Sequence, residues 1–224
     1  LASSRETTQK LADTPYLFGE IRQKSDSYLA IPEVSSERRA YLPIAFLSGV
    51  VASNKLYMVA EATNYHFGIL TSAMHMAWTR TVCGRLKSDY QYSAGIVYNN
   101  FPWPEINVGC ASRTNPSQPS PDGAHSVPYN KQLIAIETAA QLILDERKAE
   151  EDRCAKQACP EQGRRSQTCS LATLYAAGNM PQGLAKAHAA LDKAVDNAYG
   201  YKGKPTDAER IAFLFKLYQD LTGK

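Results

Sequence analysis

The sequence predicts an α+β protein: a small unit of mixed or antiparallel strands around a central amphipathic helix, followed by an all-α helical C-terminal domain. Three observations lead to this prediction. Short apolar runs interrupted by turn-forming residues, a pattern typical of strands, occupy residues 28–59. Apolar residues then recur every three or four positions through residues 67–82, which is the period of a helix. Beyond residue 130 the pattern is mainly helical.

The first half begins with a polar segment, residues 1–15, that is compatible with a helix. The strands expected after it are each a short apolar run. They are residues 28–31, 41–46 and 56–59. Pro43 puts the second of these strands at the edge of its sheet, because proline has no N–H to donate to a neighbour.

One amphipathic helix of about five turns is expected next. Asn64 offers an N-terminal cap, and the helix should end near Gly84. Residues 84–89 then predict a polar turn and residues 90–98 a further strand. Residues 99–104 should form an extended connector fixed by its prolines.

The division into domains follows from composition. Residues 111–129 are rich in proline and serine and predict a linker or loop, which separates a domain at 1–110 from a helical domain at 130–224. The first helix of the second domain is expected to end in the charge run 145–153, before a flexible insertion at 154–168.

The last two helices have recognisable ends. Pro181 fits the first turn of one helix. Thr206 and Glu209 predict a capping box at the start of the other, and Gly223 predicts its end.

Composition limits the functions that are open. The chain has 224 residues with a net charge of +3, so any grip on a polyanion must come from a local patch. Five cysteines at irregular spacing predict free thiols and neither a disulfide framework nor a zinc site. No leader and no apolar run that could span a bilayer is recognisable, which predicts a cytoplasmic protein without a membrane partner. Because the chain begins with Leu1, we expect a piece of a longer polypeptide.

Catalytic signatures are missing. The chain has neither a Gly-x-Gly-x-x-Gly turn nor a Walker loop for a nucleotide, and none of its four histidines lies in a catalytic signature. We therefore interpret His66 and His75 as structural. Residues 99–103 resemble in part the Asn-Pro-Pro-aromatic loop of amino-methyltransferases, but the second proline is absent, so we interpret this segment as structural too.

Two polar clusters remain as candidate sites. Residues 35–39, Ser-Ser-Glu-Arg-Arg, combine short donors and guanidinium groups that suit phosphate oxygens, although a solvated turn explains them equally well. In residues 79–92, Lys87 and Asp89 stand on either side of Ser88. In a major groove, Lys87 could donate to guanine O6 or N7 while Asp89 accepts from cytosine N4; the alternative is the solvated charges of an ordinary turn.

A family resemblance favours the groove interpretation. The chain resembles the target-recognition domain and the helical C-terminal domain of MmeI-like proteins, which are type IIL restriction-modification enzymes and related DNA methylases. The matching positions in the first half are residues 28–32, 35–39, 66–70, 72, 74–75, 78, 84–90, 92–93 and 98–104. Those in the second half are residues 174–175, 180–181, 184, 187–188, 191–192, 194–196 and 206–210.

The resemblance implies a noncatalytic module for sequence-specific recognition of double-stranded DNA. In the family, the residues flanking the serine of Gly-Arg-Leu-x-Ser-x-Tyr vary with the base pair that is recognised, which points to Lys87 and Asp89 and, less directly, to Gln91 and Lys55. The residues expected to contact phosphates are Ser35, Ser36, Arg38, Arg39, Arg80 and Arg85.

The rest of the parent protein is also implied by the resemblance. An upstream adenine-N6 methyltransferase domain would bind S-adenosylmethionine, and Mg²⁺ would serve an upstream endonuclease, so no cofactor or metal is expected in this chain. Two alternatives stay open: a self-contained methyltransferase that uses the loop 99–104, and a helical module for protein interaction.

Overall fold

The structure is a computed structural model that describes most of the chain. The described residues are 5–12, 14, 16, 27–105, 131–157 and 170–223. The linker expected at 111–129 and the insertion beyond residue 157 lie outside these ranges. No described helix combines the length and the apolar character that crossing a bilayer requires.

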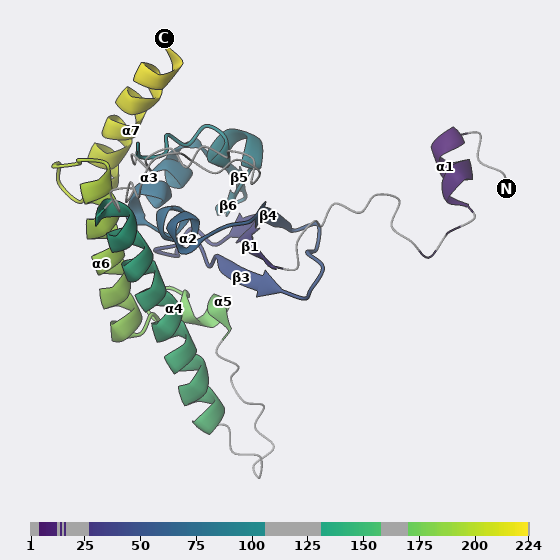
Figure 1. The fold of residues 1–224 in the computed structure, drawn as a ribbon, viewed down its shortest axis with the longest axis horizontal. Helices are drawn as coiled ribbons and strands as arrows, with labels where there is room; N and C mark the ends of the chain where they lie inside the picture. The colour runs from purple at the N-terminus through teal and green to yellow at the C-terminus, as the bar shows by residue number, and fades with distance from the viewer. Residues whose placement is uncertain are drawn as a thin grey trace, which may run out of the picture.

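The first three predicted strands form one antiparallel sheet with the order β3-β1-β4 (Figure 1). The middle strand of this sheet is almost completely buried, as an apolar run between two layers should be. Pro43 precedes the edge strand instead of lying within it, so the strand starts later than residue 41. The bounds are α1 Glu6–Leu11, β1 Ser27–Pro32, β3 Ala45–Ser48 and β4 Leu56–Ala60.

The long helix expected before Gly84 is two helices, α2 Asn64–Leu70 and α3 Ala73–Val82. The break occurs at Ser72, whose side chain accepts from the backbone N–H of His75 and starts the second helix. The apolar spacing of three and four continues across this short interruption, so periodicity alone could not reveal it. The cap of α2 is Thr63 rather than Asn64, and the amide of Asn64 donates to Gln141 at 2.9 Å.

A second small sheet replaces the turn and strand expected after residue 84. Its order is β2-β6-β5, from Val34–Ser35, Asp89–Gln91 and Gly84–Leu86. Residues Ala94–Tyr98, expected to extend a strand, form a π-helix. Side chains satisfy carbonyls of this helix, because Trp78 donates to Val97 and Asn100 donates to Gly95 and Ile96.

The second half is helical, as predicted. Its helices are α4 Lys131–Gln157, α5 Leu171–Leu174, α6 Gln182–Ala198 and α7 Asp207–Thr222. The first of them continues through the charge run, where it was expected to end. Arg147 explains this, because its guanidinium is buried and donates to Ile44 O at 2.6 Å and to the Tyr175 hydroxyl.

The helix ends agree with the capping rules in part. Thr206 caps α7 by accepting from Glu209 N, and Gly223 ends that helix with a left-handed φ of 65°. The Glu209 carboxylate reaches Lys204 N rather than the N-cap, so the capping box is incomplete. Pro181 lies at the N-cap of α6, one position before its expected place in the first turn.

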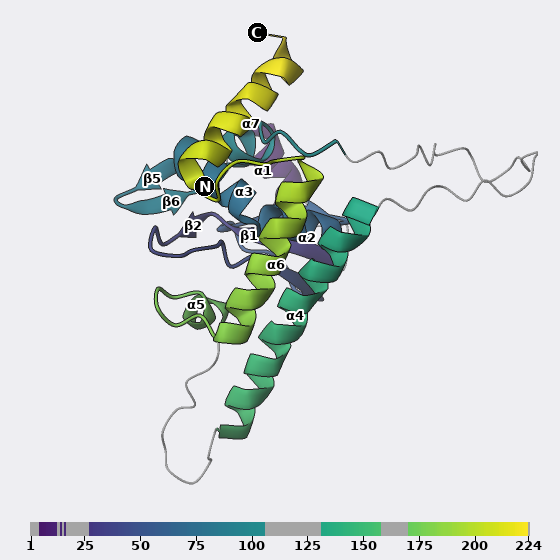
Figure 2. The same cartoon turned by 90° about the vertical axis from the view of Figure 1, so that its left-hand side faces the viewer.

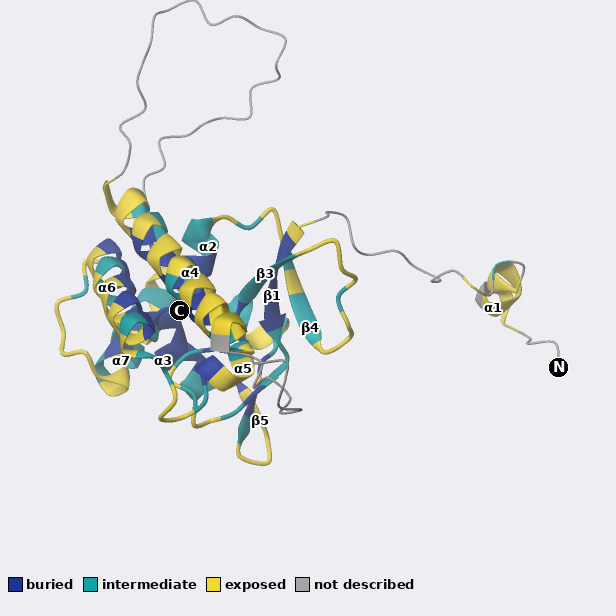
Figure 3. Ribbon diagram, turned by 90° about the horizontal axis from the view of Figure 1, so that it is seen from below, coloured by how far each residue is buried: buried dark blue, intermediate teal, exposed yellow. Residues whose placement is uncertain are grey.

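The two predicted domains share one hydrophobic core. Helix α2 packs against α4, and α3 packs against α7, so sheet and helices enclose a common interior (Figures 1 and 2). Gly68 allows α2 to pack closely against α4 and α6, because it has no side chain. A Cβ at this position would lie 2.7 Å from the Ile136 side chain and 3.2 Å from that of Leu191. In Figure 3 the buried faces of the helices point inward to this core.

Polar contacts also join the two halves. Asp192 of α6 accepts from the Tyr41 hydroxyl at 2.6 Å and from the backbone N–H of Ala73 at 2.7 Å. Burial raises the pKa of Asp192, while its hydrogen bonds from Tyr41 and Ala73 act in the opposite direction. The carboxylate thus supplies the first turn of α3 with an acceptor from a helix 119 residues away.

Three side chains test the expectations for histidine and cysteine. His75 is fully buried and contacts the Tyr92 hydroxyl, and burial lowers its pKa to about 3, so it is a neutral core residue as expected. Cys83 is a buried free thiol. Cys154 is disulfide-bonded, so the prediction of a free thiol is wrong at this position.

Gly68→Ala should lower the free energy of unfolding by about 1 kcal/mol, since overpacking costs about 1–3 kcal/mol and the helix propensity of alanine returns part of this. Denaturant titration of the variant measures the change. Gly95→Ala is the matched control, because its nearest neighbour would be Ser93 Oγ at 3.9 Å. Equal stability of the Gly68 variant and the wild type would contradict close packing at this position.

Candidate nucleic-acid interface

A two-residue hairpin turn presents Lys87 at the surface. Leu86 pairs with Asp89 across the turn, which leaves Lys87 and Ser88 at the tip. Lys87 has φ 58° and Ser88 does not have a positive φ, a combination that hairpins usually build with glycine in the first place. A lysine in this conformation is strained, and strain of this kind concentrates at functional sites. The exposed ammonium has no partner among the described residues.

Asp89 lies beside the serine and arginine loop rather than in the core. Its carboxylate accepts from the backbone N–H of Glu37 at 3.4 Å, and the Tyr90 hydroxyl donates to Glu37 O at 3.3 Å. The side chain of Asp89 is half-buried. The two polar clusters identified in the sequence are therefore neighbours, although about fifty positions separate them along the chain.

Contacts of Glu33 hold Lys55 and the strand that carries Gln91 near each other. The Lys55 ammonium forms an ion pair with Glu33 at 3.0 Å, and the Glu33 backbone connects Lys55 O with Tyr92 N. Gln91, next to Tyr92, is exposed. Sequence reasoning missed Glu33, because only the pairing of strands reveals that a residue 22 positions away holds Lys55.

The arginines and serines of the loop 35–39 differ in exposure and in hydrogen-bond partners. Arg38 is exposed, and no described group binds its guanidinium. Arg39 donates to the buried Ser35 hydroxyl at 3.2 Å, and its Nε is buried without a hydrogen-bond partner among the described residues. The Ser36 hydroxyl accepts from the backbone N–H of Arg38 at 3.4 Å.

Arg80 and Arg85 have internal partners. Arg80 pairs with Asp207 at 2.7 Å and donates to Ala40 O, which ties α3 to α7. Arg85 donates to Ser88 O at 3.1 Å and covers the Tyr90 ring at 4.3 Å, so it braces the hairpin tip. The phosphate role expected for these two residues stays a prediction. Nothing in the sequence pattern indicates that Asp207 pairs with Arg80.

The surface formed by residues 33–39, 55 and 85–91 is locally cationic. It holds five lysines and arginines against three carboxylates, all of them contributed by loops and short strands. Within the described part of the chain, no group of three or more His, Cys, Asp or Glu side chains could hold a metal ion. The chemistry available at this surface is hydrogen bonding and charge recognition.

Comparison with known families identifies both halves. Residues 1–105 match the MmeI target recognition domain, and residues 128–224 match the MmeI C-terminal domain. The chain belongs to the MmeI family. The resemblance seen in the sequence is thereby confirmed, and the two MmeI matches meet near the predicted linker.

Two relatives of the MmeI family extend this finding. DNA methyltransferase A of Bacillus subtilis (strain 168) is 37% identical over 221 residues, which are 98% of this chain and 21% of that protein. A solved structure of the type IIL restriction-modification enzyme MmeI in complex with DNA is 42% identical, with a TM-score of 0.71, over 99% of this chain and 25% of that one. The chain spans a fifth to a quarter of these relatives.

Replacing Lys87 by glycine should leave stability unchanged or raise it by up to about 1 kcal/mol, because the left-handed conformation costs a residue other than glycine about 1–2 kcal/mol and glycine returns part of this in flexibility. Chemical denaturation measures the difference. Lys87→Ala removes the same ammonium but keeps the strain, so it should show no gain. A glycine variant less stable than the alanine variant would show that the turn is not strained.

Proposed function

We propose that this chain is the module of a restriction-modification enzyme, or of a DNA adenine-N6 methyltransferase, that recognises a specific sequence in double-stranded DNA. One observation carries the proposal: a strained hairpin tip holds Lys87 outward beside Asp89, next to the cationic loop with Arg38. The module catalyses no reaction by itself. The solved DNA complex of a relative supports double-stranded DNA as the partner.

The hairpin suits a major groove. B-DNA has a major groove about 12 Å wide, which admits a two-stranded ribbon. Lys87 would donate to guanine O6 or N7, and Asp89 would accept from N4 of the paired cytosine. One G·C pair would thus be read from both strands, with Gln91 and Lys55 reading neighbouring bases. Contacts from Ser36 and the exposed Arg38 would fix the register without specifying sequence, whereas Ser35 is buried and would support this loop through Arg39.

The chemistry belongs to other parts of the parent protein. An upstream methyltransferase domain would bind S-adenosylmethionine and flip the target adenine out of the duplex, while this module holds the flanking DNA. Mg²⁺ would serve only an upstream endonuclease. We expect the parent protein to work in the cytoplasm, and exposed Phe215 and Leu221 on α7 offer an apolar contact to its other domains.

The loop 99–104 does not favour a self-contained methyltransferase. In the loop that it resembles, an asparagine amide and a prolyl carbonyl orient the target amine. Here the carbonyl of Pro102 accepts from the Tyr199 hydroxyl at 2.8 Å, so an internal donor already occupies it.

Exchanging the charges of the reading pair should change specificity at one base pair. Lys87→Glu combined with Asp89→Lys keeps the net charge, so steering toward DNA is preserved while the donor and acceptor are reversed. Selection of bound sequences from a random duplex pool should show the preference at one position shifted or lost. The control is Lys148→Glu with Asp152→Lys on α4, which is equally neutral in charge. An unchanged preference in the hairpin variant would refute the assignment.

Arg38→Ala should weaken binding to all sequences about equally. Losing one phosphate contact should reduce the slope of log K against log salt concentration by about 0.9. Binding titrations at several salt concentrations measure this slope. Lys148→Ala removes the same charge from α4 and should leave the slope unchanged. A slope in the Arg38 variant equal to that of wild type would count against a phosphate contact.

A further inference from the structure

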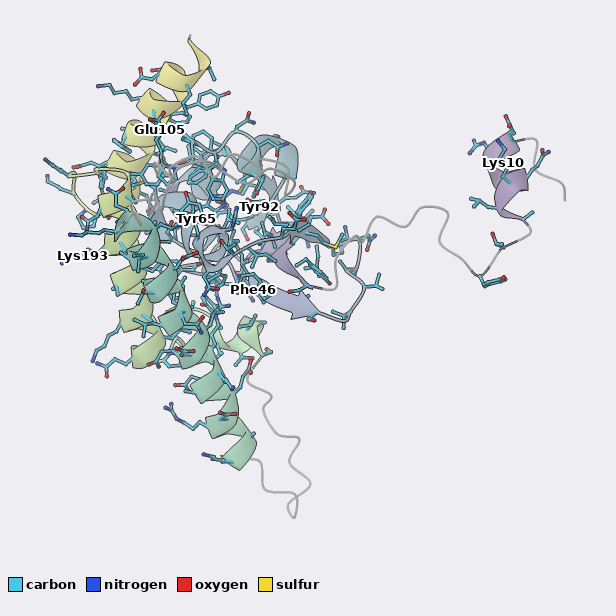
Figure 4. The ribbon with its side chains drawn as sticks, viewed as in Figure 1. Lys10, Phe46, Tyr65, Tyr92, Glu105 and Lys193 are labelled. Atoms are coloured by element: carbon cyan, nitrogen blue, oxygen red, sulfur yellow. The ribbon has the colours of Figure 1, made fainter. Side chains whose placement is uncertain are left out.

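A cavity lies directly beside the proposed base-reading surface. It has a volume of about 300 Å³ and is open on one side, between strands β1 and β4 and the π-helix. Tyr92, labelled in Figure 4 amid the strands and helices, lies at its inner end. The larger side chains that line it belong to Ile31, Tyr57, Met58, Tyr92, Tyr98 and Asn99.

The lining is aromatic and uncharged. Tyr57 and Tyr98 offer ring faces, and Ile31 and Met58 supply aliphatic surface. No lysine, arginine, aspartate or glutamate lines the cavity, in contrast to the cationic surface next to it. A phosphate would have no counter-charge here, and an ammonium group would have no carboxylate. The lining therefore favours a neutral ligand with a flat apolar face.

Hydrogen-bonding groups at the cavity have no partner of their own. In the described part of the chain, nothing binds the hydroxyls of Tyr57 and Tyr98 or the side-chain amide of Asn99, which combines a donor with an acceptor. Among the described residues, β4 is an edge strand that pairs with β1 alone. The two hydroxyls and the amide could form hydrogen bonds with a planar ring that carries both donors and acceptors on its edge.

The π-helix fixes two of these residues in position. The backbone N–H of Asn99 donates to Ala94 O at 2.9 Å, which closes the wide turn that carries Tyr98. Trp78 and Asn100 anchor the carbonyls of the same turn from the core and from its end. Tyr98 also packs edge-on against Trp103, with ring centroids 5.8 Å apart. The site is thus preformed, and π-helical turns are frequent at functional sites.

Residues of the cavity are close neighbours in sequence of two proposed base-reading residues. Lys55 directly precedes β4, which carries Tyr57, and Tyr92 directly follows Gln91. Glu33 holds both segments together through its contacts with Lys55 and Tyr92. DNA that contacts Lys55 and Gln91 would therefore present its next groups to the mouth of the cavity.

We propose that this cavity receives one nucleobase that has left the stack of the bound duplex. The inference rests on the proposed function, because it takes DNA as the partner. Of the components of DNA, the base is the one that is neutral and planar and carries donors and acceptors on its edge, whereas the backbone is anionic. Flipping of a target base on the methyltransferase domain leaves a base without its partner, and such a base leaves the stack at the lowest cost.

Photocrosslinking tests the site directly. Duplexes carry 5-iodo-2′-deoxyuridine opposite a mismatched base at successive positions, which leaves the base without its partner in the absence of the upstream domain. The crosslinked peptides of the 224-residue chain are sequenced. The proposal expects one nucleotide position to crosslink to Tyr57 or Tyr98. Crosslinks confined to residues 84–91 or to the loop 35–39 would overturn the cavity and leave the proposed function standing. A chain that binds no duplex at all would refute the proposed function itself.

Affinity provides the second measurement. A duplex with a mismatch at the crosslinking position should bind about tenfold more tightly than the paired duplex, since less energy is needed to unstack the base. Asn99→Ala, on an exposed side chain, and Tyr98→Ala should reduce this preference several-fold. Tyr98→Phe, which keeps the ring, should retain most of it. A mismatch preference that is absent in the wild type, or unchanged in both alanine variants, would overturn the proposal.

Discussion

The close packing of α2 on α4 and α6 at Gly68 is the contact on which the arrangement of the molecule depends. It brings the sheet-containing half and the helical half within van der Waals distance, so that both contribute to one core. Asp192 adds a polar tie at the same junction by accepting from Tyr41 and from the first turn of α3. Because α3 leads directly into the hairpin, this junction also determines where the reading surface stands. Lys193, labelled in Figure 4, is exposed on the same helix.

The β5–β6 hairpin combines a strained turn residue, Lys87, with contacts that hold the turn in place. Arg85 holds the tip from below, through Ser88 O and the Tyr90 ring, and the Glu37 backbone holds Asp89 from the side. With these supports the turn keeps Lys87 in a conformation that a free peptide would rarely adopt. A flexible turn would lose conformational entropy on binding, whereas a strained but fixed turn has already met that cost in folding. These supports allow a lysine to occupy a position that hairpins usually give to glycine.

The recognition surface separates three kinds of chemistry by position. The hairpin tip carries a cation and a carboxylate, which we propose for base edges, and the loop around Arg38 carries cations, which we propose for phosphates. The cavity beside Tyr57 and Tyr98 carries aromatic rings and neutral polar groups. Glu33 connects these zones through its ion pair with Lys55 and its backbone contact with Tyr92. In the proposed function, each zone would contact a different component of the DNA.

The sequence by itself determined the α+β class, the three strands of the first sheet, the helical second half, the caps at Thr206 and Gly223, and the family. These features depend on local periodicity and on residue types. Only the tertiary structure decided the break at Ser72, the π-helix at residues 94–98, the continuation of α4 past Asp145 and the partners of Arg80 and Lys55. The break at Ser72 comes from a local cap that the apolar spacing hides. In the other cases a residue distant in sequence supplies the deciding group, such as Trp78 for the π-helix and Ile44 O for Arg147. Contacts of this range leave no periodic trace along the chain, because they arise only after the core has brought the segments together.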